Sequence, residues 1–427
     1  MSRKTKTTTT KEVGKPALTP KLRFPEFRDA EGWHATPGDE LFEQINNRQA
    51  HAGLPILAIT QEHGAIPRDA IDYHVSVTDK SVETYKEVRP GDFIISLRSF
   101  QGGIEYSEYH GICSPAYVIL RKRAELSDQF FKPLFKSHSF IQQLTKNLEG
   151  LRDGKMISYK QFSELLLPNP TQPEQQKLAE CLSSVDEVIA AQSRKLDAFK
   201  THKKGLMQEL FPREGETQPR LRFPEFQDAR EWDEHALKNV FSILQGFAFS
   251  SNDSVDEGVR WLKIADVSIQ RMNHHATSYL PIQYQVKFSK VCVIEGDYVI
   301  ALTRPILNRQ LKMAQVDQVF DGALLNQRVG KLVTTQYISF VYFLLQTSKV
   351  ISDIEKSISG TEPPNLSPKK LEDLKTYIPE RPEQKKIADC LSSLDDIIAF
   401  QVQKLEALKT HKKGLMQQLF PSPEEEV

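Results

Sequence analysis

A 40-residue segment occurs twice in this chain, and this repeat constrains the fold more than any other feature of the sequence. The first copy, "PEQQKLAECLSSVDEVIAAQSRKLDAFKTHKKGLMQELFP", spans residues 173–212, and the second spans residues 382–421 with 28 of the 40 positions identical. The hexapeptide "LRFPEF" also occurs twice, at Leu22–Phe27 and Leu221–Phe226. Each half of the chain therefore has a common opening, a divergent middle and a common closing segment.

Both closing segments have the pattern of one long helix. Each has a proline and a glutamate in its first turn and a proline at its end, which are typical signals of helix boundaries. Apolar residues between these signals recur at alternating spacings of four and three, and about 37 helical residues at 1.5 Å each predict a rod about 55 Å long. The predicted coiled-coil seam consists of Leu178, Leu182, Val185, Ile189, Gln192, Leu196, Phe199, Leu206, Leu210, Ile387, Leu391, Leu394, Ile398, Gln401, Leu405, Leu408, Leu415 and Leu419.

The charges of the two segments predict how the helices pair. Each segment is acidic in its first half and basic in its second half. Parallel pairing would place Lys203 against Lys412, whereas antiparallel pairing brings each lysine near acidic residues and places Gln192 opposite Gln401. We therefore expect an antiparallel coiled coil in which the glutamine pair fixes the register. The alternative is two unrelated amphipathic helices, each packed on its own core.

The divergent middles, roughly Pro37–Leu167 and Leu237–Ile378, mix strand and helix patterns. A Gly-Asp turn opens an apolar β-branched run in "EVRPGDFIISL" and again in "CVIEGDYVIAL", and an arginine-bearing loop follows each run. Helical patterns close both regions, at Gln129–Leu148 and Gln336–Lys356. Both middles are therefore expected to be α+β domains of similar layout.

A chain of 427 residues exceeds the size of one hydrophobic core, so we expect several domains. The predicted fold class is α+β, with two globular domains of mixed helix and strand joined by two long helices in an antiparallel coiled coil, and an internal pseudo-two-fold repeat. The predicted boundaries are a disordered N-terminal arm at 1–20, a first globular domain at 21–172, the first long helix at 173–212, a linker at 213–220, a second globular domain at 221–381, the second long helix at 382–421 and a tail at 422–427.

Composition excludes few classes of protein by itself. The 56 lysines and arginines equal the 56 aspartates and glutamates, so a polyanion-binding surface must come from local segregation of charge. The four cysteines lack zinc-site spacing, and we expect reduced packing thiols and no metal site. The N-terminus lacks the apolar segment of a signal peptide, and the longest apolar run, Ile338–Leu345, is too short to cross a bilayer. These features predict a cytoplasmic protein.

A search for catalytic motifs finds none. The sequence has no GxxxxGK[ST] phosphate-binding loop and no glycine-rich turn in a dinucleotide-binding context. The Asn-Pro-Pro-aromatic or Asp-Pro-Pro-aromatic signature of amino-methyltransferases is missing too, because "PPNL" at Pro363–Leu366 lacks the residue ahead of the prolines. We therefore expect no enzymatic activity in this chain.

Polar and basic loops favour nucleic-acid binding. The loops Leu97–Gly111 and Leu302–Gln315 concentrate arginine, asparagine and glutamine, which can pair with base edges, beside cations that can bind phosphates. Ordinary polar surface loops remain the alternative. The candidate DNA-binding residues are Arg98, Ser99, Gln101, Tyr106, Arg152, Lys155, Lys160, Lys263, Arg271, Arg304, Asn308, Arg309, Gln310, Lys312 and Arg328.

The repeated motifs resemble those of the specificity (S, or HsdS) subunit of type I restriction–modification systems. The resemblance extends from about Leu22 to Pro421 and rests on "LRFPEF", the paired "PEQ…CLSS" helices, the "THKKGLMQ" endings and the "GDFIISL"-type strands. It implies two target-recognition domains, each reading half of a bipartite site in double-stranded DNA, with the coiled coil setting the spacer and docking the modification subunits.

The resemblance also implies partners that carry the chemistry. Two modification subunits would bind S-adenosylmethionine and methylate adenine, and restriction subunits would use ATP and magnesium to translocate and cleave DNA. No cofactor is then expected on this chain. A coiled-coil scaffold whose α+β domains bind protein is the competing interpretation, and a self-sufficient nuclease or methyltransferase would need a motif that the sequence lacks.

Overall fold

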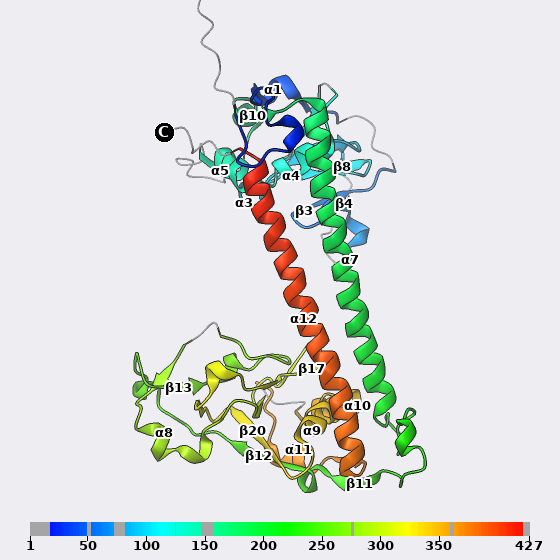
Figure 1. Ribbon diagram of the computed structural model, residues 1–427, viewed down its shortest axis with the longest axis vertical. Coiled ribbons are helices and arrows are strands. Elements are labelled where there is room, and N and C mark those ends of the chain that lie inside the picture. Colours follow the sequence, from blue (N-terminus) through cyan, green and yellow to red (C-terminus); the bar gives the residue numbers. More distant parts are fainter. Residues whose placement is uncertain are drawn as a thin grey trace, which may run out of the picture. The chain divides into compact units, whose positions relative to one another are not determined.

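The computed structural model divides the chain into two compact units. Unit 1 consists of Met1–Ser193 and Gln403–Val427, and unit 2 consists of Arg194–Val402. Each unit is described by itself below, and Figure 1 shows the elements of both. The structure describes residues 18–48, 53–71, 82–123, 125–146, 157–274, 277–358 and 363–421.

Unit 1 is built on a four-stranded antiparallel sheet in the order β2-β9-β6-β7. Its strands are β2 (Phe42–Ile45), β9 (Val118–Lys122), β6 (Phe93–Ile95) and β7 (Glu105–Tyr106). Among the described residues of unit 1, three two-stranded sheets accompany it: β1 (His34–Pro37) with β10 (Leu166–Asn169), β3 (Leu57–Thr60) with β4 (Gly64–Pro67), and β5 (Lys86–Val88) with β8 (Gly111–Cys113). The shorter helices are η1 (Pro25–Phe27), α1 (Gly38–Leu41), η2 (Arg68–Ala70), α3 (Ser99–Gly102), α4 (Asp128–Leu134), α5 (His138–Lys146) and α6 (Tyr159–Ser163).

Unit 2 repeats this plan with a four-stranded antiparallel sheet in the order β12-β20-β15-β18. Its strands are β12 (Phe241–Gln245), β20 (Val329–Thr334), β15 (Tyr298–Ala301) and β18 (Met313–Gln315). The other sheets are β14 (Tyr279–Leu280), β13 (Val259–Leu262) and β19 (Leu324–Leu325); β11 (Asp233–Ala236) with β21 (Lys375–Ile378); and β16 (Ile306–Leu307) with β17 (Gln310–Leu311). The shorter helices are η3 (Pro224–Phe226), η4 (Leu237–Asn239), η5 (Ser251–Asp253), η6 (Ile264–Asp266), α8 (Tyr284–Lys287), η7 (Ser289–Val291), η8 (Gln318–Phe320), α9 (Ile338–Leu345), α10 (Ser348–Ile358) and α11 (Pro368–Glu372).

The repeated Gly-Asp pair opens the strands β6 and β15, as the sequence predicts. Gly91 and Gly296 have φ values of 96° and 92°, a region that residues with a side chain rarely adopt. The aspartate that follows closes the turn, because Asp92 accepts a hydrogen bond from the backbone N–H of Arg89. Asp92 also receives two bonds of 2.7 Å from Arg121 of the neighbouring strand β9. The motif thus fixes both the turn and the strand pairing.

The helical region predicted at Gln129–Leu148 in unit 1 is two helices, and so is the region at Gln336–Lys356 in unit 2. The first region contains α4 and α5, and the second contains α9 and α10. A hydroxyl accompanies each break: the Ser137 Oγ accepts the N–H of Phe140, and the Thr347 hydroxyl donates to Leu344 O. These bonds satisfy a backbone N–H at the start of α5 and a backbone C=O at the end of α9. Both helix pairs share a core with the sheet of their unit.

The two long helices are α7 (Gln172–Leu210) and α12 (Arg381–Leu419), each of 39 residues. In unit 1 the first turns of α7 pack with the last turns of α12, since Leu178 and Leu182 share a core with Leu419. In unit 2 Leu210 shares a core with Ile387 and Leu391. Both pairings are antiparallel, which confirms the predicted direction, and none of the predicted seam residues is exposed.

Matched ion pairs stabilise the antiparallel arrangement in each unit. In unit 1 the Lys412 amine lies 2.6 Å from the Asp186 carboxylate, and in unit 2 the Lys203 amine lies 2.5 Å from that of Asp395. Both lysines therefore meet acidic residues of the other helix, as the charge pattern predicts. The predicted pairing of Gln192 with Gln401 would join the two units and stays a prediction.

The "LRFPEF" motif connects the two long helices within each unit. In unit 1 the Leu22 N–H donates to Gln418 O near the end of α12, and the Arg23 guanidinium forms two bonds of 2.7 and 2.8 Å with Glu174 at the start of α7. Arg23 also donates to the backbone oxygens of Ala30 and Glu31. The motif therefore holds the end of one long helix to the start of the other.

Unit 2 repeats these contacts with the helices exchanged. The Leu221 N–H donates to Glu209 O near the end of α7, and Arg222 forms bonds of 2.9 and 2.7 Å with Glu383 at the start of α12. Glu174 and Glu383 are buried, at 1% and 3% exposure. Hydrogen bonding to these carboxylates raises the pKa of Arg23 and of Arg222. We call Arg23 with Glu174 and Arg222 with Glu383 the motif–helix ion pairs.

The glutamine after each of these glutamates joins the long helix to its own globular region. Gln175 accepts the N–H of Ser127, which caps α4, and donates to Pro170 O. Gln384 likewise accepts the N–H of Tyr337, which precedes α9, and donates to Pro379 O. The repeated "PEQ" therefore starts the helix, binds the hexapeptide and positions the helices that cover each sheet.

The fold begins earlier than predicted, because Leu18, which the sequence assigns to the disordered arm, pairs with Trp33. The rest of the predicted arm, residues 1–17, and the predicted tail lie outside the described residues. The long helix α7 extends from one unit into the other, so the predicted domain boundaries stay a proposal.

Candidate nucleic-acid interface

A two-residue hairpin carries several of the predicted DNA-binding residues of unit 2. Strands β16 and β17 are joined by Asn308 and Arg309, whose φ values are 51° and 56°. A type I′ hairpin turn has positive φ at both central positions, which asparagine tolerates and which strains an arginine. Both residues are exposed, as is Gln310, whereas Leu311 is buried and anchors the hairpin in the core. The strained tip therefore presents polar groups to solvent from a fixed base.

Backbone bonds bring two further arginines to the edge that bears this hairpin. The Leu302 N–H donates to Arg328 O, and the Arg304 N–H donates to Pro364 O. Arg304 also has a positive φ of 48°. Both arginines are exposed. Segments at 302–304, 326–328 and 364–366, together with the hairpin at 306–311, thus form one surface, which we call the arginine edge.

Three other predicted residues of unit 2 lie outside the hairpin, among residues of their own unit. The Lys263 amine donates to the Ser278 hydroxyl at 3.0 Å and lies over the Trp261 ring. Lys312 is half-buried, and burial lowers the pKa of its amine. Arg271 is exposed but belongs to a turn that packs beside β18 through the bond from Gln270 N–H to Met313 O. These three residues do not belong to the arginine edge.

The predicted loop of unit 1 forms the short helix α3. Arg98 and Gln101 are exposed, and the Gln61 side chain donates to Arg98 O at 3.3 Å. Ser99 is only 1% exposed, and its hydroxyl accepts the N–H of Ser96. Its inclusion among the DNA-binding residues therefore conflicts with its position, because the hydroxyl is used to close the turn inside the unit.

Tyr106 also binds within unit 1. Its hydroxyl donates to Asp128 at 3.1 Å, and the Lys132 amine lies 3.8 Å from the centre of its ring. Burial, together with the Asp128 carboxylate, raises the pKa of this tyrosine. Both the hydroxyl and one ring face are therefore occupied, which leaves little of Tyr106 for DNA.

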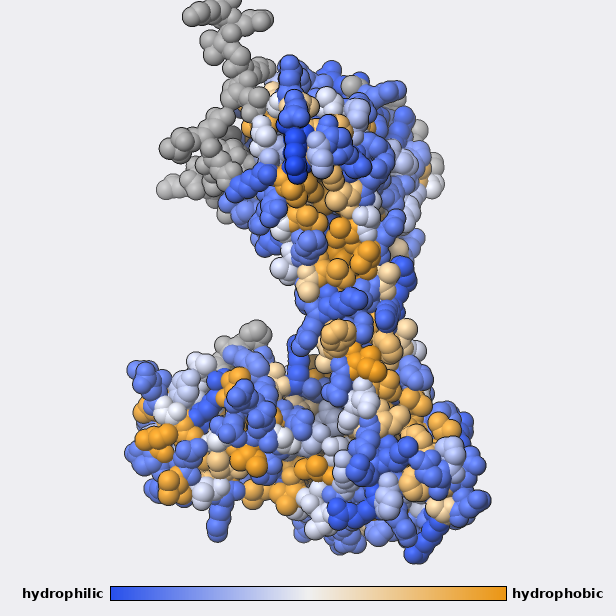
Figure 2. All heavy atoms as spheres, viewed as in Figure 1, coloured by the Kyte–Doolittle hydropathy of each residue, from blue (hydrophilic) through white to orange (hydrophobic). Residues whose placement is uncertain are grey.

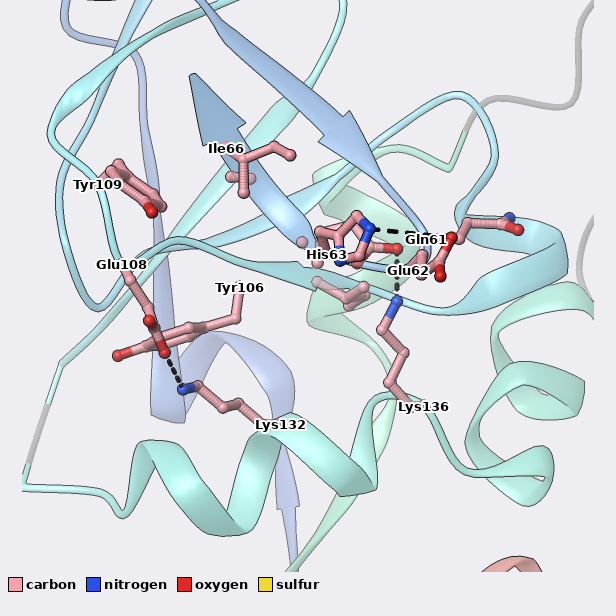
Figure 3. A pocket seen from close by; sticks show the side chains of 13 residues that line it. Gln61, Glu62, His63, Ile66, Tyr106, Glu108, Tyr109, Lys132 and Lys136 are labelled. Carbon is pink, nitrogen blue, oxygen red and sulfur yellow. Dashed lines mark hydrogen bonds and ion pairs between the residues drawn. The ribbon is translucent and has the colours of Figure 1, made fainter. Parts of the chain in front are cut away.

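Tyr106 lines a pocket of about 340 Å³ between β4, β7 and α4. Figure 3 shows Lys132 and Lys136 extending into it from the helical side. Lys132 lies 2.9 Å from Glu108, and Lys136 lies 2.5 Å from the buried Glu105. Burial raises the pKa of Glu105, against the effect of Lys136. Because each lysine already has a carboxylate partner, the pocket is poorly suited to bind phosphate.

The remaining predicted residue that the structure describes, Lys160, is exposed on α6. Arg152 and Lys155 lie outside the described residues. Within the described part of the chain, none of the exposed cations Arg98, Lys160, Arg271, Arg304, Arg309 and Arg328 lies in an ion pair. Unpaired cations are available to phosphate and to guanine without loss of an internal partner.

Sequence reasoning missed Gln245 and Asn365, two polar residues at the arginine edge. Gln245 donates to Gln327 O at 2.7 Å, and the Thr303 hydroxyl donates to the Asn365 side chain at 2.7 Å. These residues come from β12, from the loop after β15, from the loop before β20 and from the "PPNL" segment. No local pattern could have grouped them, because only the backbone pairing of distant segments brings them together.

Two searches of the described residues gave negative results. No group of three or more histidine, cysteine, aspartate or glutamate side chains is placed to hold a metal ion within this part of the chain. Among the described helices, none combines the length and apolar character needed to cross a membrane.

Comparison with known proteins gives consistent matches. Residues 229–410 match the family described as "Type I restriction modification DNA specificity domain". The MjaVIII type I restriction enzyme specificity subunit of Methanocaldococcus jannaschii is 27% identical over 348 residues, which is 80% of each protein. The EcoAI type I specificity subunit of Escherichia coli is 31% identical over 172 residues, covering 39% of this chain and 28% of that protein.

Solved structures share the fold. The type I restriction–modification system S subunit from M. genitalium aligns with a TM-score of 0.52 over 95% of this chain and 99% of its own, at 16% identity. A chain from a study of complex assembly and conformational transition of the type I R-M system aligns with a TM-score of 0.55, covering 91% of this chain and 98% of its own, also at 16% identity. Both extend over nearly the whole length of this chain.

Proposed function

We propose that this chain, which belongs to the specificity-subunit family of type I restriction–modification systems, reads a bipartite target in double-stranded DNA, one half with each unit. It is a sequence-specific DNA-recognition subunit and a non-catalytic component of its system. The competing interpretation, a scaffold whose α+β domains bind protein, is not favoured by the comparisons.

The arginine edge is the observation that carries this proposal. Arg304, Arg309 and Arg328 are exposed beside Asn308 and Gln327, and no carboxylate among the described residues pairs with these arginines. Arginine forms bidentate bonds with guanine, and asparagine and glutamine do so with adenine. A strained hairpin held by backbone bonds keeps such groups in place before DNA binds, which lowers the entropic cost of recognition. We assign base reading to this edge in unit 2.

Unit 1 would use Arg98 and Gln101 in the same role. The two units share their sheet order and their motif–helix ion pairs, but the loops above the sheets differ in length and sequence. Equivalent scaffolds with different loops suit a target whose two halves have different sequences.

The long helices would hold the two reading units apart and dock the modification subunits. Their 39 residues each give a length of about 58 Å at 1.5 Å per residue. We infer two modification subunits, which would bind S-adenosylmethionine, and restriction subunits, which would use ATP and magnesium. In this assignment the present chain supplies recognition and its partners supply the chemistry.

An exchange of reading regions tests the proposal. Replacing residues 37–167 with the same region of a relative should change one half of the methylated motif, and replacing residues 237–378 should change only the other half. The motif would be determined by sequencing adenine methylation in cells that carry the complete system. A change in both halves from one exchange, or no change from either, would contradict the assignment of one half-site to each unit.

A further inference from the structure

An exposed phenylalanine stands beside the arginine edge. Phe247 lies two residues after the end of β12 and is 46% exposed. Its N–H donates to Leu325 O and its carbonyl accepts the N–H of Gln327, both at 2.9 Å. Two backbone bonds therefore fix the residue at the surface, and the exposure is a property of the fold.

The chain before Phe247 is packed too closely to allow another arrangement. A side-chain carbon added to Gly246 would lie 2.3 Å from Asn326 O and 2.4 Å from Leu325 O. Glycine is the residue that permits such a close backbone approach. The ring itself is supported from within by Phe288 and Phe249, with centroid distances of 4.7 and 5.1 Å. The supported ring is thus held rigidly with part of its surface in water.

The ring lies between a polar and basic segment and an aromatic cluster. Gln327 and Arg328 follow in the segment that bonds to it, and Gln245 is bonded to Gln327. On the other side the Lys287 amine lies 5.3 Å from the centre of the supporting Phe288 ring. Figure 2 shows apolar side chains at the surface in the region of α8. An exposed apolar ring with polar and basic residues nearby suits a contact with DNA better than exposure to water.

Unit 1 lacks this feature at the equivalent position. Strand β2 occupies the place in its sheet that β12 occupies in unit 2, and it is followed by Asn46 and Asn47. Asn47 binds Glu87 through both its side-chain amide and its backbone oxygen. The exposed ring is therefore specific to one unit, as expected of a group that distinguishes the two half-sites.

We propose that Phe247 is a specificity-determining residue that contacts the C5-methyl group of a thymine in the half-site read by unit 2. In the major groove this methyl group is the one apolar feature on the base edges, and phenylalanine is among the side chains that contact it. The inference rests on the proposed function, since it assumes that the arginine edge faces DNA.

Methyl-deleted DNA tests this contact. Once the methylated motif is known, each thymine in both halves is replaced singly by deoxyuridine, and binding is measured with this chain assembled with its modification subunits. Wild-type protein should bind one substituted duplex about fourfold more weakly, as expected for withdrawing one methyl group from an apolar contact. The Phe247→Ala variant should bind the unsubstituted target more weakly and lose the preference for thymine at that position. Val333→Ala, which also truncates an exposed apolar residue of unit 2, should keep it.

The outcomes separate the inference from the proposed function. If specific binding occurs but no thymine substitution weakens it, or if Phe247→Ala retains the preference for thymine, the methyl contact is wrong and DNA recognition stands. If the half-site read by unit 2 contains no A·T pair, the methyl contact is also wrong. If the assembled protein shows no sequence-specific binding or methylation, the proposed function fails first. Phe247→Leu should retain part of the preference, which distinguishes loss of the contact from loss of the fold.

Discussion

Removal of one partner from a motif–helix ion pair should open the unit that contains it. The informative changes in unit 2 are Glu383→Met, Arg222→Met and the double variant. Each single change leaves one charged group buried without its counter-charge. The double change replaces both charged groups with apolar side chains of similar length. The side chains of Arg222 and Glu383 are 13% and 4% exposed, so solvent screens their interaction only weakly.

Glu383→Met should lower the free energy of local opening by about 3 kcal/mol, at the lower end of the range for breaking a buried ion pair. The lower end applies because Arg222 keeps its bonds to Ala229 O and Arg230 O, each at 3.1 Å. A cost of about 3 kcal/mol corresponds to a local opening equilibrium about 150-fold larger. The double variant should recover most of this loss, since apolar replacements of buried pairs are often neutral.

Native-state hydrogen exchange followed by mass spectrometry measures this opening peptide by peptide. Peptides at the start of α12 and around Leu221 should exchange about 100-fold faster in Glu383→Met, while peptides around Glu174 in unit 1 stay unchanged. The adjacent exposed pair Lys386–Glu225 supplies the control, and Glu225→Gln should cause no measurable change. An acceleration below tenfold, or an equal acceleration in the double variant, would refute the argument that charge burial gives the pair its importance.

Two further predictions concern the reading surface and the pH dependence of unit 1. Arg304→Ala or Arg309→Ala should cost about 1–3 kcal/mol of binding and relax the preference at one base pair, and equal weakening on all sequences would make that residue a phosphate contact. Hydrogen bonding from Arg89, with weaker help from neighbouring groups, lowers the pKa of Glu87 from 4.5 to about 2. A carboxyl group whose pKa is lower in the folded state stabilises that state above pH 4.5 and loses this effect as the pH falls toward 2. In denaturation experiments, Glu87→Gln should therefore reduce the loss of unit 1 stability between pH 4.5 and about pH 2. An unchanged loss of stability over this range would mean that other groups cause it.

The sequence predicts the parts of the fold that depend on local periodicity. The heptad pattern gives both long helices, because helix formation is read from spacings of three and four residues, and the charge gradient along each segment gives their antiparallel direction. The Gly-Asp pairs give the strands β6 and β15, since turn chemistry is also local. The motif–helix ion pairs escape such reasoning, because Arg23 and Glu174 lie 151 residues apart and nothing near either residue indicates its partner.

The candidate site was harder to predict for the same physical reason. Ser99 and Tyr106 lie in a polar loop and read as DNA-binding residues, yet their hydroxyls are bound to groups of their own unit. Composition does not distinguish a polar side chain that faces a ligand from one that satisfies the protein. Phe247 shows the opposite case, since a phenylalanine after an apolar strand is expected in the core, and only the tertiary structure shows it exposed.

The discontinuous make-up of unit 1 sets an order for its folding during synthesis. The segment Arg194–Val402 contains all of unit 2, whereas the core of unit 1 includes Leu419 and Phe420, whose ring lies 5.7 Å from that of Phe130. A ribosome that adds about 5–20 residues per second needs roughly 10–40 s to pass from residue 193 to residue 403. During this interval the apolar surface around Phe130, Leu178 and Leu182 has no partner from the chain's end. All residues of unit 2 are therefore made before those of unit 1 are complete, and the nascent unit 1 keeps this apolar surface uncovered until the last turns of α12 are made.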